Sequence, residues 1–296
     1  MRFLVTGVKG QLGYDVVREL KSRGFNDILE YDYEQMDITN KKQVEKCIVL
    51  TEPDVVIHCA AYTDVNAAED EEEKARLINV EGTRNLAQIT KLIGAKLIYI
   101  STDYVFDGEK KLGFIYETDD KVNPQSVYGK TKYEGEQEAK FNPMHFIVRT
   151  SWVFGINTKK PNFVETMLRL SETKDEIGVV CDQFGSPTYT VDLAKLLVDM
   201  ALTDKYGTYH ANNEGYTNWA VFAREIFKVN GKKTNVKNLS TDEYPQKAKR
   251  PKNSCLSKKS LDDAGFERLP DWKDALIRYS EELKNKKEEE KKLVLK

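Results

Sequence analysis

The sequence predicts an α/β fold, a doubly wound parallel sheet with helices on both faces, and three observations carry this prediction. Short runs rich in β-branched residues alternate with longer amphipathic stretches through the first 150 residues. The run Val55-Val56-Ile57 is apolar at every position, as in strands that helices cover on both sides. A glycine-rich segment joins the first such run to the first amphipathic stretch. This order is that of strand–helix–strand units, whose crossovers are right-handed.

Residues 1–150 hold this alternating pattern, and we interpret them as a dinucleotide-binding domain of the Rossmann type. The predicted strands are residues 2–6, 28–31, 55–59, 97–101 and 145–149. The predicted helices are residues 11–24, 40–51, 71–93 and 126–140.

The pattern loosens after residue 150, where glycine, proline and aromatic residues gather in clusters. Helical periodicity continues at residues 162–172, 191–202, 218–229 and 271–285. We expect residues 151–285 to form a smaller substrate-binding region. It would be interleaved with the first domain, because residues 190–210 are expected to return to that domain. The charged residues 286–296 are expected to be a solvated tail.

The composition is typical of a soluble globular enzyme, with 40% hydrophobic and 32% charged residues in a chain of 296. A net charge of −2 gives no electrostatic reason to expect nucleic acid or a membrane surface as a partner. No apolar run reaches the ~20 residues that a membrane helix needs. The four cysteines form no CxxC pair, which favours a reducing cytoplasm. The three histidines show no HxxxH spacing, so the sequence predicts no metal site.

The glycine-rich segment has the spacing GxxGxxG, with glycines at 7, 10 and 13. Such glycines allow a tight turn, a close approach of the backbone to a pyrophosphate, and close packing of the helix on the strand. The anion then lies at the positive end of the helix. A plain βα turn would also need glycine, but the position at the start of the first unit favours a cofactor site. The predicted cofactor contacts in this segment are Gly7, Gly10, Gln11, Leu12 and Gly13.

The residues near the second strand leave the choice between NAD(H) and NADP(H) open. Asp32, 19 residues after Gly13, is placed to bind the adenosine ribose, which favours NAD. Asp37 and Ile38 are placed to reach the adenine, although Asp37 is equally suited to cap the next helix. Three cations are available to bind a 2′-phosphate instead, namely Lys9, Lys41 and Lys42.

Tyr128 and Lys132 form the candidate catalytic pair, because a spacing of four places both on one helix face. An ammonium about 4 Å from the phenol stabilises the phenolate by roughly 4 kcal/mol at an effective dielectric of about 20. We therefore expect Lys132 to lower the tyrosine pKa from about 10 toward about 7, where acid–base catalysis is effective. We also expect Lys132 to hold the nicotinamide ribose. The alternative is an ordinary surface tyrosine and lysine.

Thr102 is the third candidate catalytic residue. It follows the buried strand at residues 97–101, and the carboxyl end of a parallel strand faces the crevice in which such sheets bind ligands. Its hydroxyl is suited to polarise a substrate carbonyl. The alternative is a threonine that caps the next turn.

At these residues the sequence resembles the extended short-chain dehydrogenase/reductase superfamily, and within it the dTDP-4-dehydrorhamnose reductases. The similarity runs from the glycine loop to about residue 280. It includes YGKTK at 128–132, CAAYTDVNAAE at 59–69, STDYVFDG at 101–108, RTSWVFG at 149–155, DQFGSPT at 182–188 and RPKNS at 250–254. STDYVFDG is the most discriminating of these segments, because related epimerases and dehydratases differ there.

The resemblance implies reduction of the C4 ketone of a dTDP-linked 4-keto-6-deoxy sugar, dTDP-4-dehydro-L-rhamnose, to dTDP-L-rhamnose. Tyr128 would donate the proton, Lys132 would tune it and Thr102 would hold the oxygen. By the same resemblance, the cofactor is lined by Ala60, Ala61 and Thr63. The sugar nucleotide would contact Val65, Thr102, Asp103, Tyr104, Tyr128, Trp152 and Arg250, the last at the diphosphate.

Three alternatives stay open at this stage. Some members of the family form magnesium-bridged dimers through glutamates. The matching positions here include Asp15 but no full set, so the sequence predicts no metal and leaves a monomer and a homodimer both open. A non-catalytic regulatory subunit would keep the fold, although Thr102, Tyr128 and Lys132 are all present. An epimerase or dehydratase is the other enzyme class. A dehydratase is expected to have an acid where this chain has Tyr104.

Overall fold

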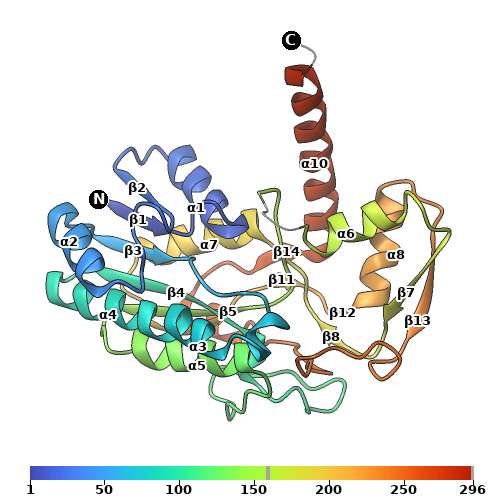
Figure 1. The fold of residues 1–296 in the computed structure, drawn as a ribbon, viewed down its shortest axis with the longest axis horizontal. Coiled ribbons are helices and arrows are strands. Elements are labelled where there is room, and N and C mark those ends of the chain that lie inside the picture. The colour runs from blue at the N-terminus through green and yellow to red at the C-terminus, as the bar shows by residue number, and fades with distance from the viewer. Residues whose placement is uncertain (158–160, 295–296) are drawn as a thin grey trace.

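A computed structural model describes residues 1–157 and 161–294 of the chain. As predicted, its centre is a parallel sheet, and the sheet has six strands in the order β10-β5-β4-β3-β1-β2 (Figure 1). These strands are β1 Phe3–Thr6, β2 Ile28–Tyr31, β3 Val55–His58, β4 Lys96–Thr102, β5 His145–Thr150 and β10 Gly207–His210.

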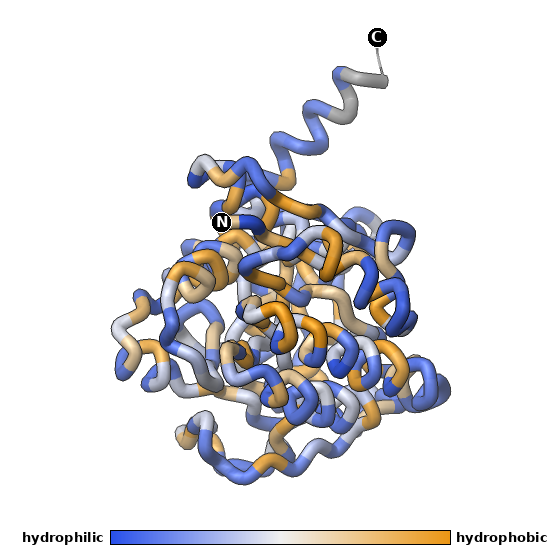
Figure 2. Tube along the Cα trace, turned by 90° about the vertical axis from the view of Figure 1, so that its left-hand side faces the viewer, coloured by the Kyte–Doolittle hydropathy of each residue, from blue (hydrophilic) through white to orange (hydrophobic). Residues whose placement is uncertain are grey.

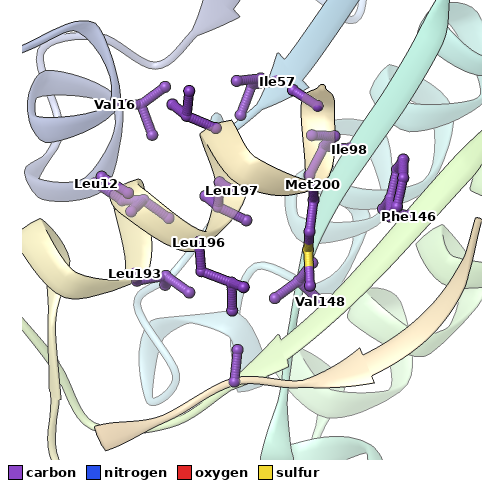
Figure 3. Close-up of a cluster of buried hydrophobic side chains, with 14 of the residues drawn as sticks. Leu12, Val16, Ile57, Ile98, Phe146, Val148, Leu193, Leu196, Leu197 and Met200 are labelled. Atoms are coloured by element: carbon purple, nitrogen blue, oxygen red, sulfur yellow. The ribbon is translucent and has the colours of Figure 1, made fainter. Parts of the chain in front are cut away.

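Helices cover both faces of this sheet, because its strands are apolar on both sides. Alternate residues of one strand, such as Val5 and Leu4 of β1, enter different cores. One core joins the sheet to α1 Gln11–Ser22 and α7 Thr190–Ala201 (Figure 3). The other joins it to α2 Lys41–Thr51, α4 Gly82–Ile93 and α5 Val127–Ala139. The two layers are the physical basis of the doubly wound arrangement.

The predicted helix at residues 71–93 is not one regular α-helix. The chain forms α3 Glu72–Arg76, a π-helical turn at Leu77–Glu81 and then α4. Within this turn, Asn79 is buried, and its amide bonds the backbone of Tyr62 and the hydroxyl of Thr131. The turn therefore directs a polar side chain between α5 and the segment after β3.

Strand β10 was not among the predicted strands. Its sequence is only four residues long and begins at Gly207, whose φ is +149°. Tyr209 packs in the core beside Phe146 of β5, and this packing makes the segment a strand. Because α7 packs against α1 in the same core, the chain returns to the sheet after residue 189.

A second lobe is built from the remaining C-terminal segments (Figure 1). Its core joins α6 Phe163–Leu170, α8 Trp219–Val229 and α10 Trp272–Val294 to the parallel pair β7 Glu176–Val180 and β13 Asn235–Leu239. The remaining short elements are β6 Val153–Phe154, β8 Phe184–Gly185, β9 Thr188–Tyr189, β11 Asn213–Glu214, β12 Thr217–Asn218, α9 Lys259–Ala264 and β14 Leu269–Asp271.

Helix α10 is longer than the predicted helix at residues 271–285. Its C-terminal half projects from the body of the molecule, and the coloured part of this projection is mostly hydrophilic (Figure 2). The helix therefore includes most of the predicted tail at 286–296, of which residues 295 and 296 lie outside the described part. Within the described residues, no helix combines the length and apolar character required to cross a membrane.

Candidate active site

The glycine loop forms a cradle at the N-terminus of α1. Gly7 has a φ of +70°, and a Cβ there would lie 2.8 Å from the Ala60 nitrogen. A Cβ at Gly13 would lie 2.3 Å from the Gly7 oxygen. Gly10 caps α1 without any side-chain hydrogen bond, so the first amides of the helix remain available to an anion. The cradle therefore fits the pyrophosphate of a dinucleotide.

The other two predicted residues of the loop have structural contacts. Leu12 packs in the core between α1 and α7. The Gln11 side-chain oxygen accepts hydrogen bonds from the Gly155 amide at 2.8 Å and from the Asn162 side chain at 3.4 Å. Gln11 thus ties the glycine loop to the second lobe.

The end of β2, where the sequence predicted contacts with the adenosine half of a cofactor, lies beside the glycine loop. The Lys9 amide donates to Asp32 at 3.0 Å. Asp37 accepts from the amide and hydroxyl of Thr39 at 2.9 and 2.7 Å, whereas Asn40 caps α2. The suggested capping role of Asp37 is therefore wrong. The Ile38 oxygen accepts from Asn85 at 2.9 Å, and its side chain is buried against Gly82.

The segment after β3 forms the next wall of the site. The Ala60 amide donates to the Thr6 hydroxyl at 3.2 Å, which holds the segment against the glycine loop. Thr6 in turn contacts the buried His58 ring at 2.8 Å. Desolvation by burial lowers the pKa of His58 to about 3, and the charge of Lys132 acts in the same direction. His58 is therefore a neutral structural residue. The neighbouring side chains are partly or fully exposed at Ala61, Thr63 and Val65.

Thr102 and Tyr128 meet where β4 ends and α5 begins. The Thr102 hydroxyl donates to Asp103 Oδ1 at 3.0 Å, and the Tyr104 amide donates to Thr102 Oγ1 at 3.2 Å. The turn cap suggested as the alternative role of Thr102 is thus present. Thr102 also forms a side-chain hydrogen bond with Tyr128. The same hydroxyl therefore both caps the turn and faces the candidate acid.

The expected lowering of the Tyr128 pKa is wrong for this chain. Desolvation by burial raises the pKa of Tyr128, and the charges of Asp103 and Tyr104 also raise it, against the hydrogen bond from Thr102. The Lys132 ammonium lies instead over the ring of Tyr99, 4.1 Å from its centroid. The spacing of four residues placed the two groups on one helix but did not determine which group each one faces.

Lys132 is buried, with 3% of its surface exposed. Desolvation lowers its pKa to about 7, while the charges of Glu136 and Cys59 oppose the change. The Tyr99 hydroxyl donates to the Lys132 carbonyl at 3.1 Å, so Tyr99 contacts both ends of the lysine. Gly135 makes room for this tyrosine, because a Cβ there would lie 2.3 Å from its hydroxyl.

A buried ion pair beneath this lysine was missed by the sequence reasoning. Glu136 is fully buried and accepts from the Arg149 Nε and Nη2 atoms at 2.8 Å each, and from the Ser101 hydroxyl at 2.6 Å. These residues lie on α5, β5 and β4, so they join the helix of Tyr128 to the strand of Thr102. Glu136 stands four residues after Lys132, and this spacing could have indicated that both lie on one helix face. Nothing in the sequence indicated that Arg149 pairs with Glu136.

The predicted substrate residues Asp103, Tyr104 and Arg250 form a second group. Arg250 Nη1 donates to the Tyr104 hydroxyl at 2.8 Å, and Nη2 donates to Asn66 at 3.1 Å. The ring of Tyr104 packs edge-on against Tyr128, with centroids 5.6 Å apart. Burial raises the pKa of Asp103 to about 6, against hydrogen bonds from Ser254 and Thr102. A cavity of about 380 Å³ opens beside Arg250, with Lys249, Lys252 and Asp107 in its wall.

Trp152 lies on the side of this region that is formed by the second lobe. Its φ is +49°, and its ring stacks on Trp219 with centroids 3.6 Å apart. A Cβ at Gly185 would lie 2.9 Å from the Trp152 ring, so the glycine allows the indole this position. Both indoles remain half-buried.

Asp15, the acidic residue at a position that binds magnesium in some family members, forms hydrogen bonds with other side chains. Asp15 accepts from Arg18 at 2.8 Å and from Thr190 at 2.5 Å, and Arg18 also pairs with Glu282 at 2.7 Å. Within residues 1–157 and 161–294, no three His, Cys, Asp or Glu side chains are grouped so as to hold a metal ion.

Comparisons with known proteins agree on one family. The family model described as "RmlD substrate binding domain" matches residues 1–285. The spore coat polysaccharide biosynthesis protein SpsK of Bacillus subtilis is 40% identical over 282 residues, 95% of this chain and 97% of that protein. The dTDP-4-dehydrorhamnose reductase structure of Clostridium acetobutylicum has a TM-score of 0.92 at 42% identity, over 96% of this chain and all of the other.

The structure of the Bacillus anthracis dTDP-4-dehydrorhamnose reductase, in complex with NADP, has a TM-score of 0.90 at 43% identity and covers 95% of this chain and 99% of that one. The predicted α/β fold and family are thus confirmed. The chain belongs to the dTDP-4-dehydrorhamnose reductase family of NAD(P)H-dependent oxidoreductases.

Proposed function

We propose that this protein reduces the C4 ketone of dTDP-4-dehydro-L-rhamnose to dTDP-L-rhamnose with NADPH or NADH. The observation that carries the proposal is the hydrogen bond between Thr102 and Tyr128, with the buried Lys132 on the same helix as Tyr128, in a chain of this family that also has a glycine cradle. The cofactor bound by the Bacillus anthracis relative supports the dinucleotide.

The glycine cradle and the segment after β3 would hold the cofactor. The predicted contacts are Gly7, Gly10, Gly13, Asp32, Asp37, Ile38, Ala60, Ala61, Thr63 and Lys132. The reduced nicotinamide supplies the hydride that reaches C4. The side chains of the protein would do the rest: they would hold the ketone and deliver one proton to its oxygen.

Tyr128 is suited to deliver that proton because it is protonated at neutral pH. A raised pKa keeps the phenol intact until the alkoxide forms, and an alkoxide is basic enough to accept its proton. Lys132 then stabilises the phenolate that remains, when the ammonium is present. This role differs from the one expected from the sequence, in which Lys132 lowers the pKa of Tyr128 before the reaction.

Thr102 would hold the ketone oxygen in the same step. Its hydroxyl proton is directed toward Asp103 Oδ1, and a hydroxyl turns easily to a new acceptor. Asp103 and Tyr104 would frame the sugar with Val65 and Trp152. Arg250, held by Tyr104 and Asn66 beside the cavity, would bind the diphosphate with its paired N–H groups.

We also propose a division of labour along the chain. Residues 1–150 and 190–210 would bind the cofactor, residues 151–285 the sugar nucleotide, and residues 286–296 neither. The cysteines Cys47, Cys59, Cys181 and Cys255 are free, which supports a cytoplasmic location. The oligomeric state, a monomer or a homodimer without a bridging metal, is tested by light scattering after size-exclusion chromatography.

The direct test is an assay coupled to the epimerase that makes the substrate from dTDP-4-keto-6-deoxyglucose. Oxidation of NADPH or NADH is followed by absorbance, and the sugar product by chromatography. We expect oxidation that requires both the sugar nucleotide and the epimerase. Cofactor binding without oxidation would contradict the proposal and favour the regulatory subunit. Formation of the C4 epimer of dTDP-L-rhamnose would correct the product.

A further inference from the structure

Asn66 lies in the segment after β3 and contacts the part of the chain that carries Arg250. It was not among the residues expected to contact the cofactor or the sugar nucleotide. We propose that Asn66 positions Arg250 for the diphosphate, because it holds the guanidinium without neutralising it. The inference rests on the proposed function, in that Arg250 binds the diphosphate of the sugar nucleotide.

Arg250 belongs to a segment that crosses from the second lobe to the first. This crossing segment, residues 240–252, contains no helix or strand. After Arg250, Pro251 packs against Gly108, where a Cβ would lie 2.5 Å from the Pro251 Cα atom. The Asn253 amide donates to the Gly108 oxygen at 3.1 Å. The backbone of the first lobe therefore fixes the chain on this side of Arg250.

Asn66 fixes the chain on the other side of Arg250. Its Oδ1 atom accepts from the buried Ala248 amide at 3.3 Å and from Arg250 Nη2 at 3.1 Å. Its Nδ2 atom donates to the Gln246 side-chain oxygen at 2.8 Å. A backbone amide and a guanidinium can only donate, so the bonds to them determine which end of the Asn66 amide is the oxygen. One side chain thus holds both the backbone before Arg250 and the guanidinium itself.

The local role that is usual for an asparagine before a helical turn belongs here to another residue. Asn66 precedes the 3-10 turn Ala67–Glu69, but its side chain forms no capping hydrogen bond. The Asp64 carboxylate accepts from the Ala67 amide at 3.1 Å instead. The hydrogen bonds of the Asn66 side chain reach residues that lie 180, 182 and 184 positions further along the chain. Capping of the turn therefore does not explain this side chain.

The two groups that hold the guanidinium are neutral. Arg250 Nη1 donates to the Tyr104 hydroxyl at 2.8 Å, and Nη2 donates to the Asn66 amide oxygen. The charge of Arg250 also acts on Asp103, whose carboxylate accepts from Thr102. A carboxylate at position 66 would orient the arginine equally well, but it would repel a diphosphate. A neutral acceptor orients the guanidinium and leaves its charge to the phosphate oxygens.

The test is a calorimetric titration of the full chain with dTDP and with thymidine, which lacks the diphosphate. Asn66→Leu removes the acceptor with little change in size. We expect it to weaken dTDP binding at least ~10-fold, the lower range for a hydrogen bond to a charged group. Thymidine binding should change by less than about threefold, because Asn66 acts on the part of the site that binds the diphosphate.

Asn66→Asp separates positioning from support of the fold. This nearly isosteric change keeps an acceptor for the Ala248 amide and for Arg250, but it adds a negative charge. We expect dTDP to bind at least ~10-fold more weakly, although the crossing segment stays in place. A purely structural asparagine would tolerate this change with the affinity for dTDP unaltered. Asn66→Asp also decides the question if Asn66→Leu fails to fold.

A double-mutant cycle shows whether Asn66 acts through Arg250. Arg250→Met should weaken dTDP binding by itself. In that background Asn66→Leu should add less than about twofold, because the guanidinium that Asn66 orients is absent. In turnover, Asn66→Leu alone should raise the KM of the sugar nucleotide, with kcat and the affinity for NADPH or NADH within about threefold of the unmodified enzyme.

Lys247→Gln is the matched control on the crossing segment. Lys247 is exposed and pairs with Asp70, which follows the same 3-10 turn. An exposed ion pair contributes little, so dTDP binding should stay within about twofold of that of the unmodified chain. A loss as large as that in Asn66→Leu would show that any weakening of the crossing segment has this effect, and would overturn the inference.

Equal losses of dTDP and thymidine affinity in Asn66→Leu also overturn the inference, as do losses that add to those of Arg250→Met. An Asn66→Asp variant that binds dTDP like the unmodified chain overturns it as well. These outcomes are separable from those of the proposed function, because dTDP binding requires no turnover. A chain that reduces the dTDP-sugar but binds dTDP independently of Asn66 refutes only the inference. A chain whose dTDP binding depends on Asn66, but which never reduces that sugar, refutes only the proposed activity.

Discussion

At the scale of single residues, burial decides the chemistry of the candidate pair. Desolvation raises the pKa of Tyr128 and lowers that of Lys132 to about 7, so each group is pushed toward its neutral form. In the proposed reaction, the protonated Tyr128 would keep its proton until the alkoxide forms, and Lys132 in its ammonium form would stabilise the phenolate that remains.

Replacement of Tyr128 should remove the proton donor without disturbing the cradle. We expect Tyr128→Phe to lower kcat at least ~100-fold, the lower range for the loss of a general acid. Its affinity for NADH or NADPH, measured by fluorescence titration, should stay within about twofold, since 0.4 kcal/mol is a twofold change. Turnover close to that of the unmodified enzyme would remove Tyr128 from the mechanism.

Lys132 should destabilise the folded state, because its ammonium is buried. A lysine whose folded pKa is lowered destabilises the fold most below that pKa, about 7, and the penalty declines as the pH rises toward the unfolded value of about 10.4. We therefore expect Lys132→Met to raise Tm, more at pH 6 than at pH 9.5. Lys130→Met is the control, since Lys130 is exposed on the same helix. A fall in Tm at pH 6 would show that the ammonium is favourably paired.

At the scale of secondary-structure elements, the ion pair between Glu136 and Arg149 aligns the site. Tyr128 and Lys132 lie on α5, whereas Thr102 ends β4, and a shift of α5 would separate them. Arg149 of β5 holds Glu136 with two hydrogen bonds, and Ser101 of β4 adds a third. The pair is almost fully buried, so water cannot take the place of either partner when that partner is removed.

Removal of both partners of this ion pair should cost less than the sum of the two single removals. We expect Glu136→Gln or Arg149→Met alone to lower the free energy of unfolding by about 3–5 kcal/mol, because the other charge stays buried. The double variant should lose clearly less than the sum of the two. Urea unfolding of the four proteins measures this coupling. Additive losses would show that the two side chains do not depend on each other.

At the scale of the whole molecule, two lobes share one chain that crosses between them. Gln11 joins the glycine loop to Gly155 and Asn162, and Arg278 of α10 donates to Asp192 of α7 at 2.7 and 2.9 Å. These contacts hold the lobe of the glycine loop against the second lobe. Near the start of the projecting end of α10, Lys286 donates to the Ile156 carbonyl at 2.9 Å.

Removal of residues 287–296 should therefore leave the fold intact. Residues 287–289 are exposed, and exposed substitutions or deletions change stability by little. We expect Tm to stay within about 2 °C of the full chain, and turnover to be unchanged. A change in Tm together with a change in molecular mass would show instead that this segment supports an assembly.

The sequence by itself determined the features that depend on neighbours along the chain. The five strands at residues 2–6 to 145–149 follow from apolar runs, and the cradle follows from Gly7 and Gly13, where a Cβ would collide with backbone. The family could also be identified from the sequence, because its short motifs consist of residues that are neighbours along the chain.

The tertiary structure alone decided what each side chain faces and how much water reaches it. Arg149 meets Glu136, Lys132 faces Tyr99, and β10 becomes a strand only because β5 lies beside it. The direction of the Tyr128 pKa is the clearest example. Spacing predicted an ammonium that acts on the phenol, but Lys132 lies over Tyr99, and desolvation, which depends on segments far apart in the sequence, raises the Tyr128 pKa.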